Sequence, residues 1–299
     1  MMGTGPVPRA SIGLPVYNGE QYLAEALDSL LAQTFEDFEL IVCDNASTDR
    51  TGEIGRDYAA QDTRVRYVRH PRHLGVMGNF RRAFELSRGQ YFRWAAADDL
   101  SAPQSLARCV EVLDREPAVV LAYPKTRFID EHGRVISDYD DRLHLQSPRP
   151  SERFRQVLER LGRCNAAYGL MRTDVLKRAR LFGDFLSSDV VFLAELSLYG
   201  TFWEVPEFLF YRRFHPSAHS SMNRAQACAF FFPDNPRRIR MRDWRHLWEY
   251  LRAVERAPLG ISEKLPLHVL LVRLAVYKRQ ELAGELFAAT RQLLAGAFR

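Results

Sequence analysis

GQYFRWAAADDLSAP, residues 89–103, begins as an apolar and aromatic run of strand length and stops on two adjacent carboxylates, Asp98 and Asp99. A buried strand that ends in acids places oxygen atoms at the carboxyl edge of a sheet, where open α/β folds bind ligands. Hard divalent cations prefer oxygen ligands, and Mg²⁺ often takes one or two carboxylates together with phosphate oxygens. The stretch therefore predicts a metal and diphosphate site. The alternative is that Asp99 or Ser101 caps a helix beginning at Pro103.

Strand-like and helix-like segments alternate along the chain around this stretch. Apolar runs predict strands at residues 10–16, 38–43, 65–68, 91–97, 119–123 and 201–214. Apolar residues at helical spacing, or capping residues, predict helices over residues 23–31, from residue 50, and over 76–86, 105–113 and 190–198. This alternation predicts an α/β fold with a doubly wound, mostly parallel sheet. Glu131-His132-Gly133 predicts a hairpin turn, and the polar residues 138–150 predict a mobile loop.

Polar side chains follow three of the predicted strands at the point where each strand ends. These pairs are Tyr17 and Asn18, Asp44 and Asn45, and Asp98 and Asp99. Because parallel strands end at the same edge of a sheet, we expect the three pairs to converge there. Tyr17-Asn18-Gly19 could also serve only as a turn, and Asp44 only as a helix cap.

The motifs at these strand ends resemble those of the family 2 glycosyltransferases. The resemblance rests on PVYNGE at residues 15–20, LIVCDNASTD at residues 40–49, and the run from Gly89 to Asp98-Asp99. It implies a single Rossmann-like, A-type nucleotide-sugar-binding domain. It also implies sites for a nucleotide at Pro15, Tyr17, Asn18, Glu20, Asp44, Asn45 and Asp98, and for a divalent cation, Mn²⁺ or Mg²⁺, at Asp98 and Asp99. In the family's Asp-x-Asp register the first acid is replaced here by Ala96.

Two further segments resemble the later motifs of the family. Asp189 follows Ser188 at a predicted helix start, where members carry the acid that serves as general base. Its alternative is a helix N-cap. Tyr211, Arg212 and His215 match a Tyr-Arg-x-x-His segment. The match implies His215 as a further metal or diphosphate ligand and Arg212 or Arg213 as a diphosphate clamp.

The C-terminal part of the chain differs from the rest in charge. Residues 222–299 hold 14 Lys and Arg against 7 Asp and Glu, whereas the whole chain has a formal net charge of +5. Five arginines cluster beside an apolar and aromatic helix face, namely Arg237, Arg238, Arg240, Arg242 and Arg245, with Trp244, Leu247, Trp248, Tyr250 and Leu251 on the face. One interpretation is peripheral contact with an anionic membrane surface at the inner face of the cell membrane. The other is a helical cap that packs on the catalytic domain or pairs two subunits.

These observations predict three segments. Residues 1–125 form the donor-binding half and 126–221 the acceptor-binding half of one catalytic domain, and 222–299 form a basic helical extension. The four cysteines form no CxxC pair and no run is long enough to span a membrane, so we expect a cytoplasmic protein. Without a nucleic-acid-binding motif, the positive charge does not indicate nucleic acid as a partner.

The predicted function is sugar transfer from a nucleoside diphosphate donor to a saccharide or lipid-linked hydroxyl acceptor, as in polysaccharide and cell-envelope biosynthesis. The resemblance implies inversion at the anomeric carbon and assistance by the metal. A catalytically silent nucleotide-sugar-binding or scaffolding protein is the alternative, suggested by Ala96 and Ser188. A nucleotidyltransferase would share a similar sheet but is disfavoured by the lack of a Gly-rich phosphate loop after the first strand.

Overall fold

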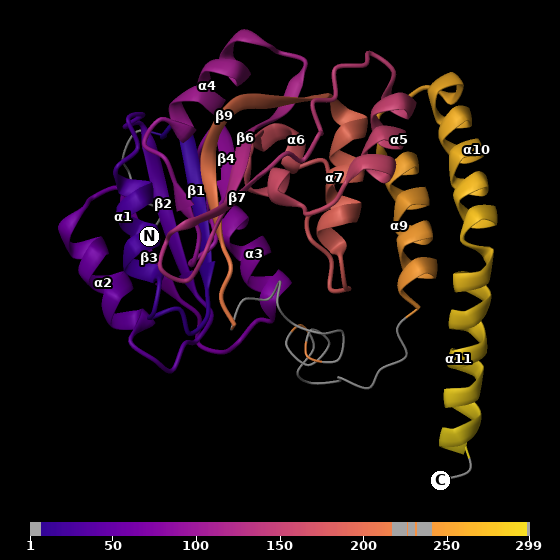
Figure 1. Cartoon of the computed structure of the whole chain (residues 1–299), viewed down its shortest axis with the longest axis horizontal. Helices are drawn as coiled ribbons and strands as arrows, with labels where there is room; N and C mark the ends of the chain where they lie inside the picture. The colour runs from indigo at the N-terminus through magenta and orange to yellow at the C-terminus, as the bar shows by residue number, and fades with distance from the viewer. Residues whose placement is uncertain (1–6, 217–225, 227–230, 232–240, 298–299) are drawn as a thin grey trace.

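The structure, a computed structural model, describes residues 7–216, 226, 231 and 241–297. Within these residues the apolar runs form one sheet with helices on both of its faces (Figure 1). The strands are β1 (Ala10–Val16), β2 (Phe38–Asp44), β3 (Val65–Arg69), β4 (Tyr91–Trp94), β5 (Leu100–Ser101), β6 (Val119–Ile129), β7 (Val135–Tyr139), β8 (Leu170–Arg172) and β9 (Thr201–Arg213).

The strand order in space is β3-β2-β1-β4-β8-β6-β9-β5, with β7 paired to β6. The strands β3, β2, β1 and β4 run parallel to one another, and β6 runs parallel to β9. The short strand β8 runs antiparallel between β4 and β6, while β5 and β7 are antiparallel at the margins. The predicted α/β fold with a mostly parallel sheet is therefore confirmed, and the hairpin expected around residues 131–133 is the turn between β6 and β7.

The helices follow the predicted segments closely in the first half of the chain. They are α1 (Leu23–Leu31), α2 (Thr51–Gln61), α3 (Val76–Glu85), α4 (Ser105–Arg115), α5 (Pro150–Arg160), α6 (Thr173–Leu176), α7 (Ser188–Tyr199), α9 (Arg242–Arg256), α10 (Ile261–Tyr277) and α11 (Arg279–Ala297), with a 3-10 turn η1 at Asn165–Tyr168. The helix after the acidic pair begins at Ser105, and its N-cap position is Gln104. Neither Asp99 nor Ser101 caps it, so the capping alternative for the acidic pair is wrong.

Two large apolar cores lie on the two faces of the sheet. Leu27 of α1 and Leu106 of α4 belong to the core on one face. Trp94 of β4 and Phe192 of α7 belong to the core on the other face, where the Trp94 ring is fully buried and lies 4.6 Å, centroid to centroid, from Phe182. The indole N–H of Trp94 donates to a backbone carbonyl of α3 at 2.9 Å, so its one polar group is satisfied.

The polar stretch 138–150 is anchored at its middle. The side chains of Leu143 and Leu145 are fully buried in the core that contains Trp94. Leu145 also exchanges backbone hydrogen bonds with Phe202 of β9, at 3.0 and 3.1 Å. These contacts hold the centre of the predicted mobile loop against the sheet.

The C-terminal helices pack on the catalytic domain. The helix α9 lies on α7, and α10 lies on α5 and α9. Tyr250 of α9 is buried edge-on against Phe154 of α5, and Arg256 forms a 2.5 Å ion pair with the buried Glu195 of α7. The packing interpretation of this segment is therefore confirmed for α9 and α10, whereas Trp244 and Trp248 of the predicted apolar face are exposed. The predicted basic residues Arg237, Arg238 and Arg240 lie outside the described residues.

Among the helices that the structure describes, none combines the length and the apolar character that a membrane crossing requires. The strand β6 runs continuously through residue 125, so the two expected halves of the catalytic domain share it. The division at residue 125 stays a prediction.

Candidate active site at the carboxyl edge of the sheet

The ends of β2, β1 and β4 lie side by side at one edge of the sheet. Val16 of β1 is in register with Asp44 of β2, and β4 pairs with the other side of β1. The segments that follow these strands open onto a cavity of about 650 Å³. The predicted site residues among its lining are Pro15, Tyr17, Asn18, Asn45, Asp98, Asp99, Asp189 and His215. The polar residues at the three strand ends thus converge as expected, although Asp44 itself does not line the cavity.

Tyr17 presents an aromatic ring at one end of the cavity. Its side chain is 43% exposed, and the ring lies edge-on to His73 with 4.6 Å between the ring centroids. The next residue, Asn18, has a positive φ of 50°, a conformation that asparagine tolerates better than most residues. Asn18 fixes the turn because its Oδ1 accepts from the Thr48 N–H at 2.8 Å. The turn therefore holds the partly exposed Tyr17 side chain at the cavity.

Asn45 and Glu20 hold neighbouring loops. Asn45 Oδ1 accepts from the Leu74 N–H at 2.7 Å, and its amide group donates to the Gly75 carbonyl at 3.2 Å. Glu20 is exposed and accepts from the Arg50 N–H at 2.9 Å. Unlike Asn45, Glu20 does not line the cavity. The predicted contacts of both residues with a nucleotide stay predictions.

Asp44 is buried behind the cavity wall and surrounded by donors. It accepts from the Ser47 N–H at 2.8 Å, the Tyr67 hydroxyl at 2.5 Å and the Arg69 guanidinium at 3.0 Å. Burial by itself raises the pKa of Asp44, but these hydrogen bonds and the charge of Arg69 outweigh it and lower that pKa below the usual carboxyl value. Asp44 thus organises the loop after β2, and its predicted contact with a nucleotide stays a prediction.

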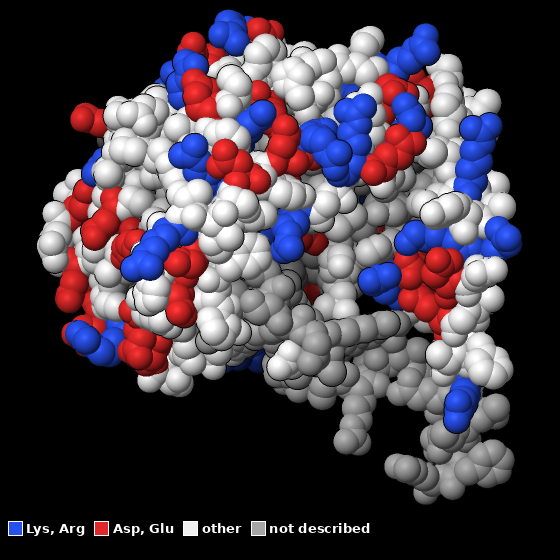
Figure 2. All heavy atoms as spheres, viewed as in Figure 1, with Lys and Arg blue, Asp and Glu red and all other residues white. Residues whose placement is uncertain are grey.

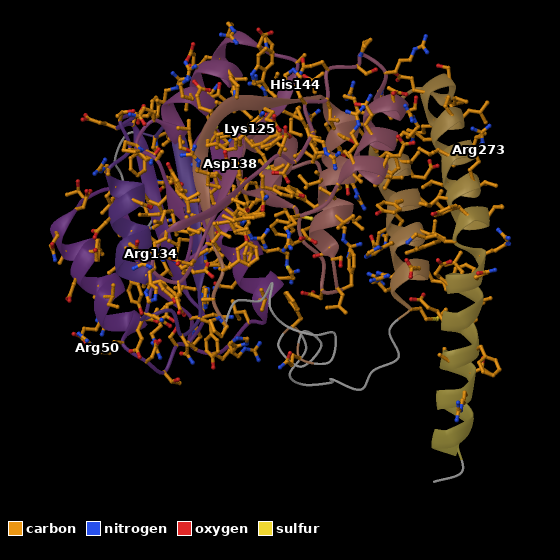
Figure 3. The ribbon with its side chains drawn as sticks, in the orientation of Figure 1. Arg50, Lys125, Arg134, Asp138, His144 and Arg273 are labelled. Carbon is orange, nitrogen blue, oxygen red and sulfur yellow. The ribbon has the colours of Figure 1, made fainter. Side chains whose placement is uncertain are left out.

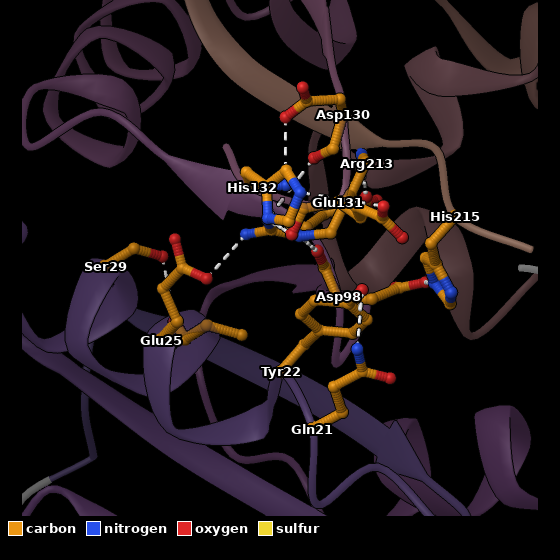
Figure 4. A network of polar contacts seen from close by, with 12 residues as sticks. Gln21, Tyr22, Glu25, Ser29, Asp98, Asp130, Glu131, His132, Arg213 and His215 are labelled. Carbon is orange, nitrogen blue, oxygen red and sulfur yellow. Dashed lines mark hydrogen bonds and ion pairs between the residues drawn. The ribbon is translucent and has the colours of Figure 1, made fainter. Parts of the chain in front are cut away.

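Asp98 and His215 bring two distant segments together at the other end of the cavity. Asp98 Oδ2 lies 3.0 Å from His215 Nε2, and the Asp98 side chain is 33% exposed. The His215 ring packs against Tyr22 with 4.8 Å between centroids. A carboxylate and an imidazole thus face the same space from the loop after β4 and the end of β9 (Figure 4).

Arg213 ties this end of the cavity to the rest of the fold (Figure 4). Its backbone N–H donates to Asp99 Oδ1 at 2.8 Å and its Nε to the Asp98 carbonyl at 2.9 Å. Its remaining guanidinium nitrogens donate to the Glu131 carbonyl at 3.2 Å and to Glu25 at 2.7 Å. The side chain is 1% exposed, and its guanidinium carbon lies 4.7 Å from the centroid of the Tyr22 ring. These bonds make Arg213 a support for the acidic pair.

Asp99 carries little compensation for its burial. Burial raises the pKa of Asp99, and the neighbouring charge of Asp98 raises it further, against the Arg213 N–H bond that lowers it.

Arg212 also lines the cavity, and it donates from Nη1 to Asn165 Oδ1 at 2.6 Å. Of the two arginines predicted as a clamp, Arg212 is the one whose side chain is not committed to the acidic pair.

Asp189 lies in the first turn of α7 and lines the cavity. The helix begins at Ser188, and its N-cap is Ser187 in a left-handed conformation with φ of 58°. Asp189 is therefore inside the helix, and the capping alternative is wrong for it too. Burial raises the pKa of the nearby Cys164 thiol, and the charge of Asp189 raises it further. The role of Asp189 as a general base stays a prediction.

The structure adds an apolar wall that the sequence did not assign to the site. It comprises Val76, Met77, Phe80, Trp94, Phe182 and Leu186. The helical spacing of Met77 and Phe80 placed them on one face of α3, but the spacing does not say that part of this face borders a cavity. Tyr22 and Arg213 were likewise not identifiable as parts of the network around Asp98, because their partners are remote in sequence.

The metal-ligating side chains at the Asp98 end of the cavity suit a hard divalent cation that takes its other ligands from a bound diphosphate. Within the described residues no group of three or more His, Cys, Asp or Glu side chains is arranged to hold a metal. One or two protein oxygens together with phosphate oxygens are nevertheless a usual arrangement for Mg²⁺. Asp98 and His215 provide an oxygen and a nitrogen ligand facing the cavity, so the residues present fit such an ion.

Comparisons with known proteins agree with this geometry. The family model described as glycosyl transferase family 2 matches residues 11–179, more than half of the chain. An uncharacterized glycosyltransferase of Methanocaldococcus jannaschii is 30% identical over 141 residues, which are 46% of this chain and 49% of that protein. The uncharacterized glycosyltransferase EpsJ of Bacillus subtilis is 35% identical over 181 residues, 60% of this chain and 52% of EpsJ. The chain thus spans about half the length of these relatives.

Two solved structures are similar over nearly the whole chain. S. aureus TarS in complex with UDP-GlcNAc superposes with a TM-score of 0.66 at 16% identity, covering 93% of this chain and 79% of that one. The mannosyltransferase PcManGT of Pyrobaculum calidifontis, in complex with GDP-Man and Mn²⁺, gives a TM-score of 0.53 at 17% identity, covering 96% and 88%. At such identities the likeness shows the fold.

Proposed function

The chain belongs to glycosyl transferase family 2 and has the A-type fold of that family, and from this premise we propose that it transfers a sugar from a nucleoside diphosphate donor to a hydroxyl acceptor. The observation that carries the proposal is the convergence of three different groups on one cavity. These are the aromatic ring of Tyr17, the carboxylate of Asp98 beside His215, and the carboxylate of Asp189.

The donor would lie along the edge of the sheet. The exposed face of the Tyr17 ring offers a stacking surface for a nucleobase, supported by its turn and by His73. The diphosphate would then lie toward Asp98, His215 and Arg212. Asp98 and His215, with Asp99 beside them, would hold a divalent cation, which would supply Lewis-acid stabilisation of the charge that develops on the diphosphate.

The acceptor would be activated by Asp189. In this mechanism the carboxylate takes the proton of the acceptor hydroxyl while the acceptor oxygen forms its bond to the anomeric carbon. The bond between that carbon and the diphosphate oxygen breaks in the same displacement, and the nucleoside diphosphate leaves with the bonding electron pair. Attack from the face opposite the leaving group inverts the anomeric configuration. Asp189 lies in the first turn of α7, and Arg213 bonds to the backbone carbonyl of Asp98, so both acids have a supported position, as such a reaction requires.

The descriptions of two structural neighbours support the proposed donor class. TarS is described with UDP-GlcNAc and PcManGT with GDP-Man and Mn²⁺. These descriptions support a nucleotide-sugar donor and a divalent cation for this chain. We propose a saccharide or lipid-linked saccharide acceptor, as in polysaccharide and cell-envelope biosynthesis, and a cytoplasmic enzyme that works at the inner face of the membrane.

Calorimetric titration with UDP, GDP, dTDP and CDP, with and without Mn²⁺, tests the proposal. We expect one nucleotide to bind in a Mn²⁺-dependent way, and Asp98→Asn to abolish that dependence. The matched control is Asp138→Asn, because Asp138 is exposed, is bonded to Arg127 at 2.9 Å and lies outside the cavity lining. Absence of binding by every nucleotide would overturn the transferase assignment.

A second candidate, a silent nucleotide-sugar-binding protein, is favoured by Ala96 in the place of the first family acid. It predicts the same nucleotide binding in the titration, but no release of nucleoside diphosphate from any nucleotide sugar. A coupled assay for free nucleoside diphosphate, run with the donors of the nucleotide that binds, separates the two. Turnover that falls in Asp189→Asn while nucleotide binding persists would support the transferase.

A further inference from the structure

We propose that the outer face of α10 and α11 docks on the surface of an anionic lipid bilayer. The biological sense of this docking rests on the proposed transfer to a lipid-linked acceptor, but its evidence comes from these two helices alone. Figure 1 shows α10 and α11 following one another in nearly one line along the side of the molecule, beyond α9.

The two helices have an inner face that is packed and an outer face that is not. Leu267, Leu271 and Leu282 are buried on the inner side. The outer stripe consists of exposed apolar residues, namely Ile261, Leu265, Val269, Val272, Val276, Leu286 and Phe287. Ile261 is 87% and Phe287 73% exposed, so the described residues leave this stripe uncovered.

The outer stripe continues from α10 onto α11, and the two helices lie nearly in one line (Figure 1). Leu265, Val276 and Phe287 recur every 11 residues, a spacing that stays close to one side of an α-helix. From Ile261 to Phe287 the stripe is about 40 Å long, at 1.5 Å per residue. A straight stripe of this length presents a flat apolar edge, as a helix lying in the plane of a membrane surface does.

The charges beside the stripe have one sign. With about 100° per residue counted within each helix, Arg273 of α10 falls about 80° from Leu265, and Arg279 and Arg291 of α11 fall within about 80° of Phe287. The acids lie farther round, because Glu263 falls about 160° from Leu265, and Glu281 and Glu285 fall about 120° and 160° from Phe287. Glu285 accordingly accepts from backbone N–H groups of α9, at 3.1 Å from Asp243.

The figures agree with this separation of charge. Arg273 projects from α10 away from the body of the molecule in Figure 3. In Figure 2 the outer edge of these helices shows uncharged and basic atoms, while the acidic atoms nearby lie toward α9. An apolar stripe flanked by arginines complements anionic headgroups above acyl chains.

Two exposed tryptophans lie on α9, the helix next to α11. Trp244 and Trp248 are 39% and 54% exposed, and the Trp244 indole N–H donates to the Leu282 carbonyl of α11 at 3.0 Å. This bond places Trp244 beside α11. Tryptophan favours the interfacial region of membranes, where an apolar ring and a polar N–H are both satisfied.

A second copy of the chain fits this surface less well. In a symmetric dimer through the stripe, the arginines of one subunit would face those of the other, because the acids of the described helices point elsewhere. Like charges across an interface oppose association. An anionic bilayer is therefore the occupant that the charges favour.

Flotation of the full chain with phosphatidylcholine vesicles, with and without phosphatidylglycerol, tests the proposal. We expect binding to the anionic vesicles that weakens with added salt, and binding to the neutral vesicles at least about tenfold weaker. Val276→Glu should weaken anionic-vesicle binding about tenfold or more, since it places a charge within the stripe. Val135→Glu is the matched control, because Val135 of β7 is 55% exposed and Val276 is 58% exposed.

Three results would overturn the proposal. The first is no binding of the unmodified chain to anionic vesicles at low salt, and the second is equal binding by Val276→Glu and the unmodified chain. The third is a lipid-free dimer by light scattering that Val276→Glu converts to a monomer, which would assign the stripe to a second copy. Nucleotide titration of the same samples separates this question from the proposed function, because vesicle binding without nucleotide binding would refute only the latter.

Discussion

Asp44 and Asp99 are both acids that follow a strand, and both are buried at the same edge of the sheet, but their environments shift their pKa values in opposite directions. Three donors surround Asp44 and lower its pKa, whereas Asp99 has the Arg213 N–H and the adjacent charge of Asp98, and its pKa is raised. The negative charge of Asp44 is compensated by the protein. The carboxyl groups of Asp98 and Asp99 lie at the cavity, and the raised pKa of Asp99 shows that the protein disfavours a second negative charge there, which a bound cation would favour.

The largest expected effect is a loss of activity when the carboxylate of Asp98 is removed. Asp98→Asn should lower kcat/KM roughly 100-fold or more, because it removes a carboxylate that faces the cation and the diphosphate. Its melting temperature should change little, since the side chain is a third exposed and bonded to His215. A steady-state assay and a melting curve on the same preparation check both. Full activity of Asp98→Asn would contradict the proposed role of the Asp98 carboxylate.

The second effect is on stability and concerns Asp44. Asp44→Asn should lower the free energy of unfolding by about 2 kcal/mol, because it weakens charge-assisted hydrogen bonds from Tyr67 and Arg69 to a buried carboxylate. Arg69 is 45% exposed, so solvent screens its charge and limits its share of the effect. Chemical denaturation measures the change, with Asp138→Asn as a surface control that should stay within about 0.5 kcal/mol of the unmodified protein.

The pH dependence of that stability difference is the third effect. Because folding lowers the pKa of Asp44, its charge stabilises the fold above the ordinary carboxyl pKa of about 3.9 and stops doing so as pH falls through the lower folded value. The gap in melting temperature between the unmodified protein and Asp44→Asn should therefore be full at about pH 7 and pH 5 and shrink at about pH 3. A gap that widens on acidification would mean that the folded pKa is raised.

The sequence predicted the edge of the sheet well because its signals there are local. Strand ends and helix spacing follow from residues close together in the chain, so Tyr17, Asp44 and Asp98 could be assigned to one edge, whereas Asp189 was assigned through the family resemblance. Arg213 could not be told apart from Arg212 because its partners, Asp98 and Glu25, are 115 and 188 residues away. The antiparallel β8 was missed because three residues carry too little pattern to predict a strand.

Some sequence signals stayed ambiguous because they depend on tertiary contacts. Asp99 and Asp189 both fit a helix-cap pattern, yet the helices begin at Ser105 and Ser188. Capping residues and ligand-binding acids have the same composition, and only their environment distinguishes them. Asp44 and Asp99 show the same limit of prediction, because in the sequence each is an acid that comes after a predicted strand. The position of such an acid is predictable from sequence, but its pKa and role are set by donors brought in by the fold.

The smallest expected effect concerns Ala96, which stands where the family carries another acid. Ala96 lines the cavity two residues before Asp98, so Ala96→Asp would add a carboxylate to the uncompensated end of the site. We expect Mn²⁺-dependent nucleotide binding to tighten about threefold to tenfold, or roughly 1 kcal/mol, since a second carboxylate is within the usual coordination of such ions. Ala96→Asn is the control, because it has nearly the same shape without the charge. Equal affinities for the two variants would show that charge at position 96 does not reach the cation, and that Asp98 with its neighbours already supplies what the site uses.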